Sequence, residues 1–152
     1  MENMLWMCNV VNLALAVGLF LGVRWMIRVA VLWLVPGLPL WLYYETLNGG
    51  WLLTSFLTHI GGLTVGLFAV YKTGSGHRTW LHAFVFFLIF QQFSRAFTPP
   101  ASNVNVAHIV PPGWEGMFNS YRVYWLISTL TVAPTLWLLG RISLSLFPPR
   151  DT

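Results

Sequence analysis

The chain has 152 residues, of which 57% are hydrophobic and only 8% carry an acidic or basic side chain. Soluble domains carry roughly 25% charged residues, so this composition is typical of a protein whose solvent is lipid. The net charge of +4 comes from scattered Lys and Arg residues, which excludes a nucleic-acid-binding patch. The single cysteine, Cys8, excludes an intrachain disulfide and argues against a zinc-thiolate cluster.

Five apolar runs are long enough to cross a bilayer as helices, which takes about 17–25 residues. In chain order, they cover residues 4–22, 28–44, 52–71, 79–97 and 121–146. The first run begins after Glu2 without a basic flank, so we interpret it as a retained span and not as a signal peptide. The second run contains Pro36 and Pro39, which predict a kink. We therefore expect an all-α fold: one domain over residues 1–152, built as a polytopic membrane bundle of five transmembrane helices.

Basic residues predict the orientation, because cytoplasmic loops are enriched in Lys and Arg. Two of them, Arg95 and Arg122, fall on one side of the predicted spans. The other six fall on the opposite side: Arg24, Arg28, Lys72, Arg78, Arg141 and Arg150. The sequence therefore predicts an outside N-terminus and a cytoplasmic C-terminus. The 45–51 turn and the long 98–120 loop then lie outside, and the four prolines of that loop indicate an ordered cap.

Polar side chains of the predicted spans collect toward the outer face. At a rise of about 1.5 Å per residue, Cys8 lies roughly 6 Å below the outer end of the first span and His59 roughly 10–12 Å below that of the third. An unpaired polar group is costly in lipid, and ionisable side chains in spans usually face the bundle interior. Ser55, His59, Gly62 and Gly66 share one face of an α-helix, and the two glycines admit a neighbouring helix closely. We therefore expect His59 to be buried against protein.

Cys8 and His59 form the nucleophile–base pair that the sequence predicts, since histidine is the usual base for a catalytic cysteine. Taken alone, Cys8 is more readily explained as a small buried hydrophobic residue, and a structural role for His59 is as plausible as a catalytic one. Because the two residues lie at a common depth, a shared catalytic role is favoured. No acidic residue lies inside a predicted span, so an amide or hydroxyl would have to orient the imidazole or stabilise an oxyanion. The candidates for these roles are Asn12, Ser55, Gln91, Arg95, Asn103 and Asn105.

Three short segments carry a resemblance to a known family: "LWMCN" at the first span, "LTHIGG" in the third, and "NVNVAHIVPP…SYRVYWL" leading into the last. Together they resemble the YwaF-type integral membrane family, which is related to a vertebrate transmembrane phospholipid acyltransferase and more distantly to androgen-induced-gene-type membrane lipid hydrolases. The resemblance implies that Cys8 and His59 are catalytic. The chain departs from the family where Leu5-Trp6-Met7 replaces a Leu-His-Leu segment, where Asn103-Val104-Asn105 replaces Asn-Tyr, and in its five spans instead of six or more.

Our leading hypothesis is a membrane enzyme that transfers or hydrolyses lipid acyl groups through a Cys8 thioester, with His59 as general base and no metal or organic cofactor. Membrane lipids are its expected partners; a homo-oligomer remains open. The alternative is a non-catalytic membrane module that binds a small ligand or a partner membrane protein. A third and weaker hypothesis is haem ligation by His59 with His108, since His82 lies near the other membrane face.

Overall fold

The computed structural model describes residues 6–48, 53–111 and 113–150, and within these ranges it contains helices and no strand. In chain order, the first two helices are α1 (Met7–Leu21) and α2 (Arg24–Asn48). They are followed by a continuous helical segment made of α3 (Leu53–Phe56), the π-helical turn η2 (Leu57–Gly61) and α4 (Gly62–Thr73). The last two helices are α5 (Thr79–Phe97) and α6 (Tyr121–Leu146). Three short 3-10 turns lie between α5 and α6: η3 (Pro100–Ser102), η4 (Val104–Val106) and η5 (Glu115–Met117). The all-α prediction is thus confirmed for the described residues. Its five helical segments correspond to α1, α2, α3 to α4, α5 and α6.

Three helical segments of the described chain are long and apolar enough to cross a membrane: Arg24–Tyr43, Leu53–Thr73 and Tyr121–Leu146. The apolar helix α1 is shorter, at 15 residues. Helix α2 continues through Pro36 and Pro39 and ends only at Asn48. Each proline removes one helical hydrogen bond, yet the helix continues across both.

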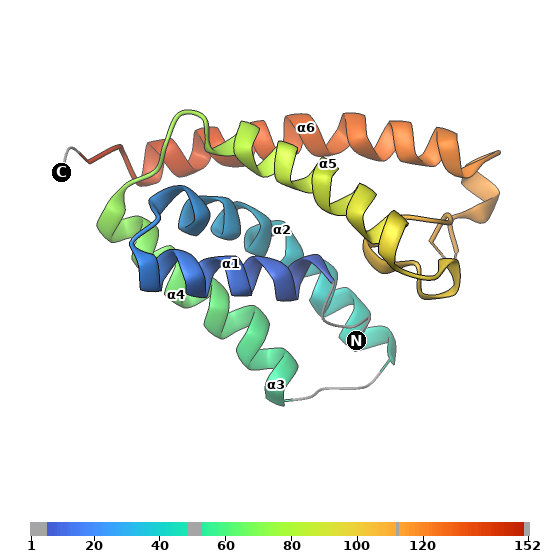
Figure 1. Cartoon of the computed structure of the whole chain (residues 1–152), viewed down its shortest axis with the longest axis horizontal. Coiled ribbons are helices and arrows are strands. Elements are labelled where there is room, and N and C mark those ends of the chain that lie inside the picture. The colour runs from blue at the N-terminus through green and yellow to red at the C-terminus, as the bar shows by residue number, and fades with distance from the viewer. Residues whose placement is uncertain (1–5, 49–52, 112, 151–152) are drawn as a thin grey trace.

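Helix α2 lies at the centre of the fold. Figure 1 shows α1, α2 and α4 grouped together, with α5 and α6 side by side above them, and α2 contacts all four. One buried cluster contains Val11, Leu15, Ile27, Ala30, Val31, Leu34, Ala69 and Val70, from α1, α2 and α4. A second contains Val29, Leu32, Ala83 and Leu136, from α2, α5 and α6. The buried residues of α2 lie mainly in its first half, at Ile27 to Leu34, whereas Leu40 and Tyr43 in its second half are 67% and 62% exposed.

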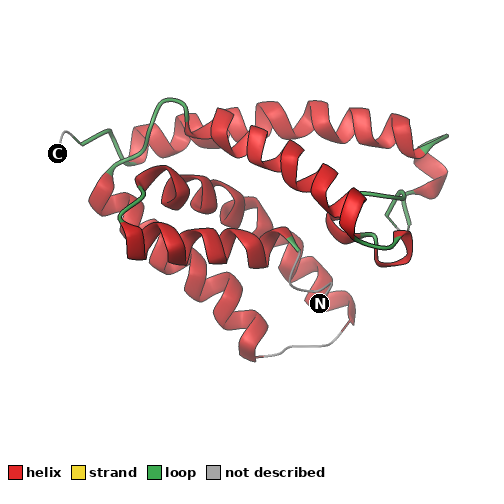
Figure 2. Ribbon diagram, viewed as in Figure 1, coloured by secondary structure: helices red, strands yellow, loops and turns green. Residues whose placement is uncertain are grey.

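The outward surfaces of the helices are also apolar. Along α6, for example, Leu130 is 63% exposed and Leu138 is 54% exposed. The loops gather at the two ends of the bundle (Figure 2). A contiguous exposed apolar surface marks contact with a membrane or with another protein, which agrees with the membrane-protein class predicted from composition.

Close helix contacts occur at the two glycines of the predicted packing pair. A Cβ atom built on Gly66 would lie 2.6 Å from Cγ2 of Val31 and 3.4 Å from Leu15, while one on Gly62 would overlap the amide oxygen of Asn12. The glycines therefore admit α1 and α2 closely, and the packing prediction is confirmed. Gly61 differs, since a Cβ there would meet nothing within 4 Å.

These contacts predict opposite effects for two neighbouring substitutions. Gly66→Ala should destabilise the fold by about 1–3 kcal/mol, because the stiff Val31 side chain has no room to move. Gly61→Ala should be neutral or stabilise by up to about 1 kcal/mol through its helix propensity. Unfolding of the two variants in detergent micelles measures the difference. Equal stabilities would contradict the packing described for α4.

Candidate functional site

The segment that carries His59 is not a continuous α-helix. The spacing of Ser55, His59, Gly62 and Gly66 predicts one shared face at 3.6 residues per turn, but the structure places a π-helical turn over Leu57–Gly61. The four side-chain positions nevertheless all face α1 or α2: Ser55 and His59 lie against Trp41, and the two glycines lie against Asn12 and Val31. Adjacent Gly61 and Gly62 hold the α-conformation weakly, which allows tertiary contacts to set the local geometry. Single π turns occur frequently at functional sites.

The His59 imidazole is held in a defined orientation. The side chain is 8% exposed, and its ring stacks on the Trp41 indole with the centroids 4.8 Å apart and the planes 11° from parallel. Its Nδ1 lies 2.9 Å from the Ser55 carbonyl oxygen. Since a carbonyl only accepts hydrogen bonds, Nδ1 donates and Nε2 is the basic nitrogen of the neutral ring. The predicted burial of His59 against protein is confirmed.

An acidic residue belongs to the same surroundings. The Trp41 indole N–H donates to Glu45 Oε1 at 3.0 Å and to Ser55 Oγ at 2.7 Å, and the Ser55 hydroxyl donates to Glu45 Oε1 at 3.1 Å. We refer to Trp41, Glu45, Ser55 and His59 as the His59 cluster. The apolar pattern predicts a second span that ends at residue 44, with Glu45 in the following turn, whereas α2 continues past Glu45 to Asn48. The four-residue spacing of Trp41 and Glu45 was the signal for this contact.

Cys8 lies at the start of α1, one turn before Asn12. The Asn12 amide donates to the Cys8 carbonyl at 2.8 Å, and its oxygen abuts Gly62. Because α1 and α4 run in the same direction (Figure 1) and His59 precedes Gly62 by one turn, this contact places Cys8 and His59 in adjacent turns of packed helices. The Cys8 side chain is half-buried, and its thiol makes no hydrogen bond to the described His59 ring.

Gln91 and Arg95, predicted near the site, make contacts between α5 and α6. The buried Gln91 accepts a hydrogen bond at 2.6 Å from the Trp125 indole. The exposed Arg95 guanidinium lies 5.3 Å from the ring centroid of Tyr121. Gln91 therefore joins two helices, which is the role that its residue type more often has in a membrane helix.

Asn103 and Asn105 organise the loop between α5 and α6. Both adopt positive φ, at 39° and 54°, a conformation that asparagine tolerates better than most residues. The Asn103 oxygen accepts the backbone N–H groups of His108 and Ile109, each at 3.0 Å. The Asn105 oxygen accepts the backbone N–H of Met7 at 2.7 Å, while its amide donates to Ser94 Oγ at 2.8 Å.

These bonds place the loop directly against the start of α1, beside Cys8. Val104 and Ala107 within it are fully buried, and the Tyr121 hydroxyl donates to the carbonyls of Val106 and Ala107. The loop therefore has its own packed interior, as expected of an ordered cap. His108 lies with Nε2 3.3 Å from the Thr98 hydroxyl.

Comparisons with protein-family models, with curated proteins and with solved structures each found no match to this chain.

Proposed function

We propose that the chain is a five-span membrane protein, with its N-terminus outside and its C-terminus in the cytoplasm, that transfers or hydrolyses lipid acyl groups. Cys8 is the nucleophile and His59 the general base. The observation that supports this most strongly is the orientation of His59. Its Nδ1 donates to the Ser55 carbonyl, which leaves Nε2 as the base. His59 also lies one helical turn before Gly62, the residue that contacts Asn12 of α1. The resemblance to a membrane acyltransferase family supports the same pair.

The reaction begins when His59 Nε2 accepts the thiol proton and the Cys8 thiolate attacks the ester carbonyl of a lipid. The ester C–O bond breaks, and the imidazolium returns the proton to the departing alcohol, leaving an acyl-Cys8 thioester. A second alcohol or a water then attacks the thioester, with Nε2 accepting its proton, and the thiol is restored. The Cys8 thiol and His59 Nε2 must come within hydrogen-bonding distance for the first step. Catalytic hydrogen bonds commonly reach that distance only when substrate binds.

The His59 cluster holds the imidazole in one orientation for this cycle. Its ring stacks on Trp41, and the Glu45 carboxylate accepts the N–H of the same indole. The 98–120 loop, anchored beside Cys8 through Asn105, is positioned to cover the site as a lid. The lipid substrate would enter from the membrane between helices, and the scheme uses no metal or organic cofactor.

A second candidate function is a non-catalytic module that binds a small ligand or a partner membrane protein. It is favoured by the hydrogen bonds of Gln91, Asn103 and Asn105, whose side chains are used within the fold. The exposed apolar surface of α6 would then contact a partner or a second copy of the chain. If the protein is such a module, Cys8→Ser and His59→Asn should change its stability or assembly, and neither the wild type nor the variants should turn over a lipid substrate.

The acyl-enzyme proposal predicts covalent labelling of Cys8. Incubated with a radiolabelled phospholipid, the full chain should acquire a hydroxylamine-sensitive acyl group, measured by scintillation and intact mass. Cys8→Ala should abolish the label, and His59→Asn should slow it by roughly 10²–10⁴-fold through loss of the base. His108→Asn is the matched control and should label normally. Labelling that persists in Cys8→Ala would exclude the mechanism, and absent labelling with ordinary thiol reactivity would favour the second function.

The proposed orientation predicts which connections a membrane-impermeant maleimide reaches. In a Cys8→Ala background, Ser120→Cys before α6 should react in intact cells, whereas His77→Cys between α4 and α5 should react only after permeabilisation. Both native side chains are exposed, so access depends on the side of the membrane. The reverse pattern would invert the topology, and reaction of both in intact cells would contradict it.

A further inference from the structure

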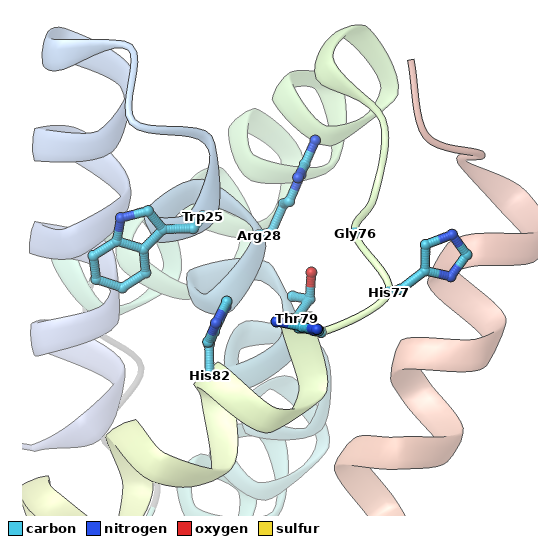
Figure 3. A pocket seen from close by; sticks show the side chains of 7 residues that line it. Trp25, Arg28, Gly76, His77, Thr79 and His82 are labelled. Atoms are coloured by element: carbon cyan, nitrogen blue, oxygen red, sulfur yellow. The ribbon is translucent and has the colours of Figure 1, made fainter. Parts of the chain in front are cut away.

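A second polar site lies at the end of the helices opposite the His59 cluster. A pocket of about 340 Å³ is bounded by the start of α2, the 74–78 connection and the first turn of α5 (Figure 3). Its lining includes Trp25, Arg28, Gly76, Arg78, Thr79 and His82, and no acidic side chain of the described residues. The pocket therefore has a positive electrostatic character.

The Arg28 guanidinium is fixed at the edge of this pocket. Its Nε donates to the Gly74 carbonyl at 2.8 Å and its Nη2 to the Thr73 carbonyl at 3.0 Å. These bonds orient the planar group and leave Nη1 on the pocket side, beside Gly76. A Cβ atom on Gly76 would lie 3.0 Å from Arg28 Nη1 and 3.1 Å from Thr79 Oγ1. The absent side chain at Gly76 thus keeps open the space next to both groups.

Thr79 provides an independent indication of a ligand. The residue is 4% exposed, its hydroxyl makes no hydrogen bond within the described chain, and Figure 3 shows that hydroxyl directed toward Arg28. The hydroxyl faces the pocket space and can therefore form a hydrogen bond with a molecule bound there. Thr79 also begins the 19-residue helix α5, whose N-cap Arg78 makes no side-chain capping bond. The Thr79 N–H donates to the Gly76 carbonyl at 3.1 Å, so the first-turn N–H groups left for an anion are those of Trp80 and Leu81.

We propose that this pocket binds a phosphate group, held by Arg28 Nη1, Arg78, the Thr79 hydroxyl and the N-terminus of α5. The chemistry fits a phosphate ester or free phosphate: guanidinium and hydroxyl donors around one small space, with no carboxylate to repel the anion. A basic pocket between membrane helices on the cytoplasmic side suits the headgroup of an anionic phospholipid. The inference does not depend on acyl chemistry at Cys8.

The test uses the purified full chain in detergent with three ligands: phosphatidylglycerol, phosphatidylcholine and inorganic phosphate. Native mass spectrometry measures lipid retention, and the thermal unfolding temperature measures phosphate binding. Gly76→Ala adds a methyl group at the site without removing charge, while Thr79→Val removes the hydroxyl at constant shape. Two controls match them: Gly116→Ala, which adds a methyl into open space, and Arg141→Gln, which removes an exposed charge outside the pocket.

We expect phosphatidylglycerol to be retained in preference to phosphatidylcholine, and Gly76→Ala and Thr79→Val each to weaken that binding about tenfold, the effect of losing one charge-assisted hydrogen bond. Both controls should bind as the wild type does. If inorganic phosphate alone raises the unfolding temperature and both pocket variants abolish the rise, the site takes free phosphate. If only phosphatidylglycerol binds, it takes the lipid headgroup. Equal retention of both lipids with no phosphate effect, or equal losses in controls and pocket variants, would overturn the proposal.

Discussion

The arrangement of this protein depends on the close approach of α4 to the helices beside it. Gly66 allows Val31 and Leu15 into the space that a side chain would fill, and Gly62 does the same for the Asn12 amide. In a bilayer, lipid tails are as apolar as leucine, so helices associate through close packing more than through removal of apolar surface from water. This contact fixes the register of α1 against α4 and places the Cys8 turn next to the π turn that holds His59. Together with the contacts of α2 to the other long helices, this approach determines where the polar side chains meet.

Within that packing, each polar side chain of the interior needs a partner, and this need explains much of the local structure. His59 uses the Ser55 carbonyl and the Trp41 face, and Trp41 in turn connects Ser55 and Glu45. Asn105 supplies an acceptor for the first N–H group of α1, which no helical bond satisfies. Thr129 is the exception among the described residues, because its Oγ1 is buried without a hydrogen-bond partner, whereas the Thr79 hydroxyl faces the pocket beside Arg28.

The positions of the helices could be predicted from sequence because long apolar runs have few structural alternatives in lipid. The limits of α5 and α6 agree with the predicted residues 79–97 and 121–146. The burial of His59 and the packing role of Gly62 and Gly66 also followed from residue type and spacing. The π turn could not be predicted, since tertiary contacts set it in a segment whose spacing also fits an α-helix. Glu45 was missed because its contacts depend on how far α2 extends beyond the apolar run. The roles of Asn103 and Asn105 follow from positive φ values, which the sequence alone does not specify.

The central proposal is that the Cys8 thiol and the His59 imidazole act on one lipid ester, and the distance between them in a lipid-bound state tests it most directly. An experimental structure with a non-hydrolysable phospholipid analogue would give the separation of Cys8 Sγ and His59 Nε2. The proposal predicts a separation within about 4 Å, with the ester carbonyl of the analogue beside the sulfur. Side chains that remain apart, with the lipid ester bound elsewhere, would contradict it.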